Sequence, residues 1–215
     1  MLRILSWNVL YRDYEEKYCP KSKVLSSYPD ENDRIKNMLD LLKSNVTENT
    51  IICMQEVSDL VIKELNKTFG KEYSIFTYNI RDNEHLVTIT PRGFSKIAAF
   101  TNASTNGYII VENDKFVVIN CHLIPQRYSN VDVLSYLIEF HKTNSKIIIA
   151  GDFNEKHSIV KERLENYFTC PFYGNTYKKN PIDHIIFNCF GEFTPEKVHQ
   201  KYISDHHMIK IDIKL

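Results

Sequence analysis

Short apolar runs with the composition of β-strands recur along this chain and alternate with stretches that have the periodicity of amphipathic helices. Strand-type runs are expected at residues 1–7, 50–54, 147–150, 182–187 and 208–213, with further short runs between residues 73 and 123 that include a hairpin of 108–111 with 116–119. Helices are expected at residues 35–42, 58–68, 131–141 and 158–167, and a polar segment at 11–32. Strands outnumber helices, so the pattern predicts two packed sheets with helices on their outer faces.

The chain has 215 residues, of which 43% are hydrophobic, enough to bury one core but too short for two full ones. We therefore expect one domain spanning residues 1–215, without repeats or linkers. Basic and acidic residues number 27 each, so no overall field attracts nucleic acid or a membrane. A local basic patch beside a cleft remains compatible with this balance.

The N-terminal residues have the alternation of a strand and lack the features of a secretion signal. No stretch reaches the roughly 20 apolar residues of a membrane span. The five cysteines include no Cys-x-x-Cys pair, so neither a disulfide framework nor a zinc knuckle is indicated. We expect a cytoplasmic, monomeric protein without a membrane association, and a nuclear location stays open.

Polar clusters follow or adjoin the strand-type runs at positions where neither a strand nor a turn requires them. These clusters are Asn8, Gln55-Glu56, Asn120-Cys121-His122, Gly151-Asp152-Phe153-Asn154, Asp183-His184 and Ser204-Asp205-His206-His207. If the strands point the same way, their polar ends converge at one edge of the core. Taken singly, each cluster has a structural explanation, such as a turn former for Asn8 or a solvated charge for Glu56.

Brought together, the acidic side chains of these clusters would repel one another, and a hard divalent cation is the simplest remedy. The carboxylates are Glu56, Asp152, Asp183 and Asp205. Oxygen ligands favour Mg²⁺, with Mn²⁺ as a substitute, over zinc. His122 and His206 can become cationic and hold a phosphate oxygen. This combination indicates hydrolysis of a phosphate ester.

The cluster Gly151-Asp152-Phe153-Asn154 carries the sharpest single signal. Gly151 allows a tight approach of the backbone after the strand. In an extended segment, residues two apart project to one side, so Asp152 and Asn154 are expected to address the same phosphate.

Six motifs in this order resemble those of the endonuclease/exonuclease/phosphatase superfamily. They are Ser6-Trp7-Asn8-Val9-Leu10, Gln55-Glu56-Val57, Asn120-Cys121-His122-Leu123, Gly151-Asp152-Phe153-Asn154, Ile182-Asp183-His184-Ile185 and Ser204-Asp205-His206. The resemblance implies an α/β (α+β) fold, a four-layered sandwich of two mainly antiparallel β-sheets flanked by helices. It also implies Glu56 as the principal metal ligand, with Asn8 and Asp205 nearby.

The same resemblance implies the catalytic roles. Asp152 orients or deprotonates the attacking water, and His206, held by Asp183, stabilises the pentacovalent transition state. Asn154 and His122 bind phosphate oxygens. No covalent enzyme intermediate is expected.

Within the superfamily, Asn8-Val9-Leu10, Tyr18-Cys19-Pro20 and residues 51–57 are most similar to the deadenylase and nocturnin branch. The expected activity is a Mg²⁺-dependent phosphodiesterase, a nuclease that acts on RNA or short oligonucleotides. Alternatives are a tyrosyl-DNA phosphodiesterase, a phosphoinositide phosphatase and a non-catalytic nucleic-acid-binding module. An abasic-site endonuclease is disfavoured, since those enzymes usually carry an acidic residue where Leu10 stands.

Overall fold

The structure is a computed structural model that describes residues 1–101, 107–124, 139, 146–188 and 191–214. Its strands are β1 (Leu2–Asn8), β2 (Thr50–Val57), β3 (Tyr73–Arg81), β4 (Glu84–Pro91), β5 (Ser95–Thr101), β6 (Gly107–Glu112), β7 (Val117–His122), β8 (Ile147–Asp152), β9 (Asp183–Phe187), β10 (Phe193–Val198) and β11 (Met208–Ile213). Its helices are α1 (Arg12–Tyr18), α2 (Lys23–Ser27), α3 (Glu31–Asn45), α4 (Asp59–Phe69) and α6 (His157–Leu164). Apart from residue 139, the helix expected at 131–141 lies outside the described residues.

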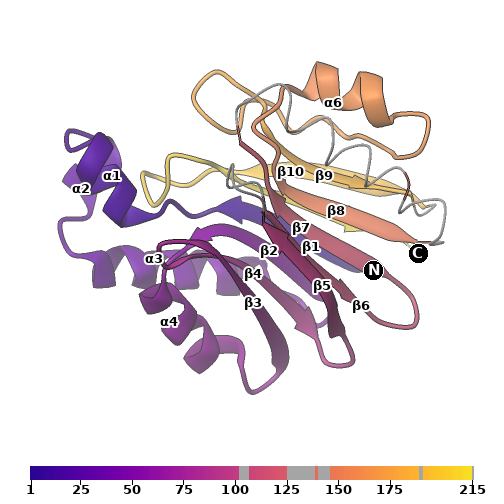
Figure 1. The fold of residues 1–215 in the computed structure, drawn as a ribbon, viewed down its shortest axis with the longest axis horizontal. Coiled ribbons are helices and arrows are strands. Elements are labelled where there is room, and N and C mark those ends of the chain that lie inside the picture. Colours follow the sequence, from indigo (N-terminus) through magenta and orange to yellow (C-terminus); the bar gives the residue numbers. More distant parts are fainter. Residues whose placement is uncertain (102–106, 125–138, 140–145, 189–190, 215) are drawn as a thin grey trace.

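The strands form two sheets that pack face to face (Figure 1). The six-stranded sheet has the order β10-β11-β1-β2-β4-β3, and the five-stranded sheet has the order β5-β6-β7-β8-β9. Each sheet contains one parallel pair, β1 with β2 and β7 with β8, and the other pairs are antiparallel. The expected arrangement of two mainly antiparallel sheets is therefore confirmed.

Buried side chains that alternate between the two faces of the strands form three apolar layers. Ile4 of β1 and Ile148 of β8 belong to the core between the sheets. Leu5 packs with α3 and α4 on the outer face of the six-stranded sheet. Ile149 packs with α6 on the outer face of the five-stranded sheet. Because neighbouring residues of a strand point to opposite faces, each buried strand serves two layers, and the result is a four-layered sandwich (Figure 1).

Three of the four helices expected from apolar spacing lie within the described residues and form there, with α3 extending beyond the expected 35–42 at both ends. Ser58 accepts a hydrogen bond at its Oγ from the Val61 N–H and caps α4, which ends just before Gly70. The helix expected at 158–167 begins at His157 but ends at Leu164, so Tyr167 lies beyond it. None of the described helices is long and apolar enough to cross a membrane.

Two regions contain elements that the sequence pattern did not indicate. The polar segment 11–32 forms the short helices α1 and α2, and α1 buries only Glu15, so no apolar periodicity announces it. Strand β10 joins the edge of the six-stranded sheet beside β11 and is largely exposed. It includes Pro195, which a sheet edge tolerates because no partner needs its missing N–H.

A fully buried arginine of α3 joins two loops at one end of the sandwich. The Arg34 guanidinium donates to the carbonyl oxygens of Val9 at 2.6 Å and Leu10 at 3.3 Å, after β1. It also donates to the carbonyl oxygen of Ile203 at 2.9 Å, before β11, and Glu31 neutralises it. These contacts hold the segment that follows Asn8 against the segment that precedes Asp205.

Candidate active site

The polar clusters meet at one end of the two sheets. The parallel pairs place Asn8 beside Gln55 and His122 beside Asp152 at the carboxyl ends of their strands. Strand β9 runs antiparallel to β8, so Asp183, its first residue, is paired with Asp152. Strand β11 is likewise antiparallel to β1, and the residues that precede it reach the same end. Two strands therefore contribute their starts to this end of the core, and four contribute their ends.

A buried amide pair joins the two sheets beneath this end. Gln55 Nε2 of β2 donates to Asn120 Oδ1 of β7 at 2.8 Å. Asn120 Nδ2 in turn donates to the carbonyl oxygens of Met54 at 3.1 Å and Val87 at 2.9 Å. Buried polar groups that satisfy one another restrict the relative placement of the elements that carry them. The pair thus fixes how the two halves of the site face each other.

Glu56 lies in an irregularity of β2, where the register against β4 shifts between Met54 and Val57. Its backbone has φ 56°, a left-handed conformation that a non-glycine residue adopts at a cost. The carboxylate accepts hydrogen bonds from Asn8 Nδ2 at 2.8 Å and from the Tyr11 N–H at 2.9 Å. The bulge thereby turns Glu56 out of the strand and toward Asn8.

Asp152 lies at the centre of the site with only 1% of its surface exposed. Its Oδ2 accepts from Asn8 Nδ2 at 3.0 Å, and its Oδ1 accepts from the Asn154 N–H at 2.8 Å. Burial, together with the neighbouring Asp183 carboxylate, raises the pKa of Asp152 to about 6, although His206 acts in the opposite direction. A carboxylate with a pKa near neutrality is suited to accept a proton.

The loop after β8 differs from the extended segment expected from the sequence. A Cβ on Gly151 would lie 1.8 Å from the Cys121 carbonyl oxygen, so only glycine allows this approach of β8 to β7. Asn154 is left-handed with φ 47°, and its Nδ2 donates to the Leu123 carbonyl oxygen at 2.6 Å. The expectation that Asp152 and Asn154 lie in one extended segment is therefore wrong, but both residues line the same cavity.

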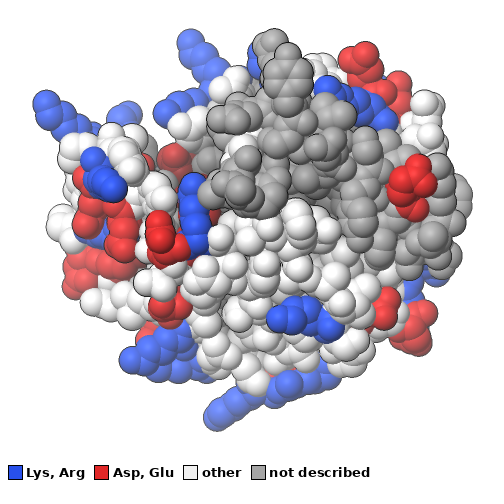
Figure 2. All heavy atoms as spheres, viewed as in Figure 1, with Lys and Arg blue, Asp and Glu red and all other residues white. Residues whose placement is uncertain are grey.

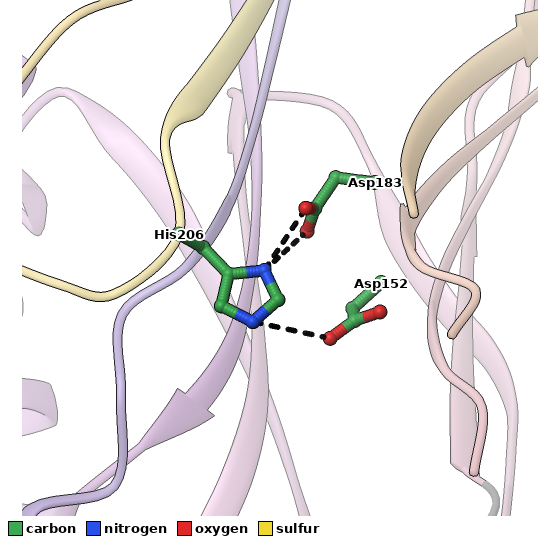
Figure 3. A group of neighbouring side chains, drawn as sticks. All are labelled: Asp152, Asp183 and His206. Atoms are coloured by element: carbon green, nitrogen blue, oxygen red, sulfur yellow. Dashed lines mark hydrogen bonds and ion pairs between the residues drawn. The ribbon is translucent and has the colours of Figure 1, made fainter. Parts of the chain in front are cut away.

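His206 lies between two carboxylates, as Figure 3 shows. Its Nδ1 is 2.9 Å from Asp183 Oδ2, and its Nε2 is 3.8 Å from Asp152 Oδ2. Burial opposes protonation of the imidazole, but Asp183 and Asp152 outweigh it and raise the pKa of His206 well above its usual value. The Asp183 contact assigns the Nδ1 proton, so Nε2–H points toward the cavity.

His122 is held by a carboxylate that the sequence did not single out. Its Nδ1 lies 3.3 Å from Glu84 Oε1, and its Nε2 lies 3.8 Å from both Glu56 Oε1 and Asp152 Oδ2. Burial lowers the pKa of His122, but Glu84, Asp152 and Glu56 together raise it to about 9. Glu84 also pairs with Arg81 at 2.7 Å.

Neither Glu84 nor Tyr177 carries a signal in the sequence. Glu84 follows the turn Asp82-Asn83, where a charged residue is usually exposed, yet only 1% of its surface is exposed. The Tyr177 ring stacks on His206 with centroids 4.6 Å apart and planes 27° from parallel. Only contacts between distant segments reveal these two residues.

The site forms a cavity of about 570 Å³, lined among others by Glu56, His122, Asp152, Asn154, Asp205 and His206. Asn8 and Asp183 are buried in its wall. Burial raises the pKa of the Asp205 carboxyl. All eight residues expected at the site are thus brought together.

The charges of the site fit a divalent cation. Its carboxylates are those of Glu56, Glu84, Asp152, Asp183 and Asp205, and its cationic groups are His122, His206 and Arg81. Glu155 and Lys156, at the cavity wall, offset each other. Five negative and three positive charges leave a net charge of −2, which one divalent cation would balance.

Two sets of side chains could hold the ion. Ligand atoms of Asp152, Asp183 and His206 lie within 4.8 Å of one another. However, His206 is hydrogen-bonded to Asp183 and favours its protonated form, which is not a metal ligand. The oxygens around Glu56 and Asp152 fit a hard cation better.

A neutral histidine behind the site should make the stability of the protein depend on pH. His184 is buried with its Nε2 2.8 Å from the Glu155 carbonyl oxygen, and burial lowers its pKa to about 4. The unfolded chain, in which the histidine pKa is near 6.5, binds the proton first, so the contribution of His184 to stability is complete above pH ~6.5 and falls as the pH drops toward 4. Between pH 7 and pH 5 this contribution should fall by about 2 kcal/mol. The raised pKa values of Asp152, His122 and His206 act in the opposite direction.

Urea unfolding of the metal-free protein at both pH values measures the change in the free energy of unfolding. From pH 7 to pH 5, His184→Gln should become more stable relative to the wild type by about 2 kcal/mol, whereas His199→Gln, at an exposed position, should change as the wild type does. An equal change in all three proteins would contradict the assignment.

Comparison with known proteins places this geometry in a family. The model of the Endonuclease/Exonuclease/phosphatase family matches residues 5–206. No curated protein sequence matches the chain significantly. These comparisons do not bear on the deadenylase and nocturnin branch.

Solved structures share the fold at low sequence identity. A truncated Caenorhabditis elegans TDP2 is 16% identical with a TM-score of 0.71, over 98% of this chain and 96% of that one. A D. rerio TDP2 complexed with single strand DNA product is 15% identical with a TM-score of 0.69, over 98% of each chain. The Bacteroides thetaiotaomicron mannosyl-6-phosphatase Bt3783 is 14% identical with a TM-score of 0.71, over 100% of each chain. The chain belongs to the endonuclease/exonuclease/phosphatase family, whose members are hydrolases that act on phosphoester bonds.

Proposed function

We propose that this protein is a Mg²⁺-dependent phosphodiesterase that cleaves RNA or short oligonucleotides by in-line attack of water. The observation that carries the proposal is the pairing of His206 with Asp152. A cationic imidazole, oriented by Asp183, faces a buried carboxylate of raised pKa across 3.8 Å in one cavity. Such a pair supplies a proton acceptor and an oxyanion partner in adjacent positions.

Asp152 takes the role of the base. Its hydrogen bonds from Asn8 and the Asn154 N–H leave the carboxylate in a fixed orientation. It accepts the proton of the attacking water, and its pKa near neutrality matches that task. A base of this kind contributes roughly 10²–10⁴-fold to the rate.

His206 and His122 stabilise the phosphoryl group. Asp183 holds the His206 ring, and Glu84 holds the His122 ring, so both Nε2–H groups approach the cavity. They donate to the nonbridging oxygens, whose charge increases in the transition state. Asn154, in the loop after β8, contributes a further polar contact to the phosphate.

Glu56 would hold the divalent cation, with Asp205 as an additional oxygen ligand. Asn8 would join them through Oδ1 only with its amide turned over, because its Nδ2 faces Glu56 and Asp152 and its Oδ1 accepts from the Leu10 N–H. Their hard oxygen donors favour Mg²⁺, with Mn²⁺ as a substitute. When bound, the cation acts as a Lewis acid on the phosphoryl oxygen and lowers the pKa of coordinated water. We also propose that residues 1–215 act as one catalytic domain, monomeric and cytoplasmic.

A tyrosyl-DNA phosphodiesterase is the second candidate. It is favoured by the similarity to TDP2, including a TDP2 structure that holds a single strand DNA product. The similarity to a mannosyl-6-phosphatase leaves a phosphomonoester substrate as a further possibility. A phosphoinositide phosphatase and a non-catalytic nucleic-acid-binding module are the remaining alternatives.

A substrate panel tests the proposal. Poly(A), mixed RNA, single-stranded DNA, a tyrosyl-DNA conjugate, inositol phosphates and mannose 6-phosphate are each incubated with Mg²⁺ or EDTA. We expect cleavage of oligonucleotides with Mg²⁺ and none with EDTA. Release of inorganic phosphate from the small phosphomonoesters alone, or turnover that EDTA leaves unchanged, would refute the proposal.

A further inference from the structure

A second and larger cavity adjoins the active site. It has a volume of about 870 Å³ and shares Tyr177 and Asp205 with the catalytic cavity. Helices α1 and α2, the segment around Tyr177 and the loop before β11 line it. We call it the α1–α2 groove, defined by Tyr18, Lys21, Lys23, Tyr177, Lys178 and Tyr202.

Aromatic rings and lysines alternate along the α1–α2 groove. Tyr18 is 62% exposed and Tyr202 is 37% exposed. The Lys23 Nζ lies 5.4 Å from the Tyr202 ring centroid, and the Lys178 Nζ lies 4.5 Å from the Tyr177 ring centroid. Basic side chains project from the end of the molecule where Figure 1 places α1 and α2, with acidic ones beside them (Figure 2).

The α1–α2 groove has a positive charge, although the chain as a whole is neutral. The groove contains three lysines against Glu15 and Asp205, and Asp205 faces the proposed cation. Once the bound cation neutralises the Asp205 carboxylate, the three lysines make the wall of the groove cationic. A polyanion that extends from the catalytic cavity would therefore be attracted along it.

Tyr177 connects the two cavities. Its ring stacks on His206, and its hydroxyl accepts a hydrogen bond from Lys178 Nζ at 2.5 Å. A ligand in the groove and a phosphate at His206 would both touch this residue. The two cavities are thus adjacent parts of one surface.

Tyr202 is held in a strained conformation at the edge of the groove. Its φ is 59°, in the left-handed region that tyrosine rarely adopts. Gln200 Oε1 accepts from the Ile203 N–H at 2.6 Å, and Arg34 donates to the Ile203 carbonyl oxygen at 2.9 Å. Such strain persists where the surroundings impose it, and it is concentrated at functional sites.

We propose that the α1–α2 groove binds the single-stranded nucleotides on one side of the scissile phosphate. This inference rests on the proposed function and names the substrate subsite. Bases stack on exposed tyrosines, and lysines neutralise the backbone phosphates, which is the combination that single-strand binding requires. The volume is near the upper end of the roughly 300–1,000 Å³ of small-molecule sites, so it exceeds what a single phosphosugar or inositol headgroup needs.

Binding without turnover is the first test. Fluorescence anisotropy with a labelled single-stranded oligonucleotide whose linkages are hydrolysis-resistant phosphorothioates is measured with Mg²⁺ for the wild type, Tyr18→Ala, Tyr202→Gly and Lys21→Gln/Lys23→Gln. Each tyrosine variant should weaken binding roughly tenfold, within the range for base stacking. The lysine variant should make the salt dependence shallower, with a slope in log[salt] smaller by about 1.4.

Matched controls separate the groove from general effects. Phe193→Ala removes a ring that is 40% exposed on β10, at the end of the sheet away from the site. Lys36→Gln removes an exposed charge from α3. Both should bind as the wild type. Tyr202→Gly also relieves the positive φ, so weaker binding by this variant cannot come from unfolding if its Tm is unchanged or higher.

Cys19 provides a direct probe, because it lines the groove and is exposed. The oligonucleotide should slow its alkylation at least severalfold, as followed by mass spectrometry of the peptide that contains it. Equal alkylation rates with and without saturating oligonucleotide would place the ligand elsewhere.

Hydrolysis distinguishes failure of the groove from failure of the proposed function. With Mg²⁺, the groove variants should lose at least tenfold more kcat/KM on an oligonucleotide than on bis(4-nitrophenyl) phosphate. If the oligonucleotide is cleaved but variants and wild type bind it equally, the groove proposal falls and the function stands. If the variants weaken binding but nothing is cleaved, the function falls and the groove stands. Displacement of the oligonucleotide by equimolar inositol phosphate or mannose 6-phosphate would overturn the assigned ligand class.

Discussion

Replacement of Asp152 by Asn should lower kcat for phosphodiester hydrolysis by about 10³-fold or more, near the upper part of the range for a lost general base. The amide has the shape of the carboxylate but cannot accept the proton of the attacking water. It also relieves the repulsion from Asp183 that raises the Asp152 pKa. Initial rates on an oligonucleotide and on bis(4-nitrophenyl) phosphate, both with Mg²⁺, measure the loss.

The fold of this variant should remain intact. Loss of one hydrogen-bond acceptor toward Asn8, and of the charge that faces His122 and His206, opposes the relief of repulsion. The free energy of unfolding should therefore change by no more than about 2 kcal/mol. Asp40→Asn, on an exposed part of α3, serves as the control and should keep full activity. A folded Asp152→Asn protein with wild-type turnover would remove Asp152 from the chemistry.

Replacement of Glu56 by Gln should weaken the affinity for Mg²⁺ or Mn²⁺ by more than 100-fold, since residues that merely support metal ligands already cost about 10–100-fold when changed. The amide retains one oxygen but carries no charge to balance the cation. Calorimetric titration with Mn²⁺ measures the affinity, and activity at low Mg²⁺ should fall in parallel.

The geometry of Glu56 makes the result specific. The positive φ of this residue does not depend on the charge, so Gln can occupy the same backbone position. Its single carbonyl oxygen keeps one of the two hydrogen bonds that Glu56 accepts from Asn8 Nδ2 and the Tyr11 N–H. Glu72→Gln, at an exposed position before β3, should bind metal as the wild type. Unchanged Mn²⁺ affinity in Glu56→Gln would shift the metal to the group of Asp152, Asp183 and His206.

The strands of the core could be predicted because each is a short apolar run with a clear boundary. The alternation of Ile4 with Leu5 reports two buried faces, and the structure shows the same residues in two different layers. The hairpin of β6 and β7 forms with Val111 opposite Val118. Local patterns of this kind depend on neighbours in the chain, so the sequence contains them directly.

The helices α1 and α2 could not be predicted in the same way. They are short, and α1 buries only the polar Glu15, so no apolar period distinguishes them from a polar loop. Yet they form one wall of the groove beside the active site. Short helices gain their stability from tertiary contacts more than from propensity, and those contacts are not local.

The sequence by itself determined which chemical groups stand at the strand boundaries, since the carboxylates, imidazoles and the required Gly151 are recognisable by type and position. Only the tertiary structure decided how they meet: β9 enters the site with its first residue, β11 brings the residues that precede it, and Glu56 leaves its strand through a bulge. It also decided that Glu84 supports His122 and that Tyr177 stacks on His206. The physical reason is that strand direction, register and long-range pairing depend on the packing of the two sheets, to which residues far apart in the chain contribute together.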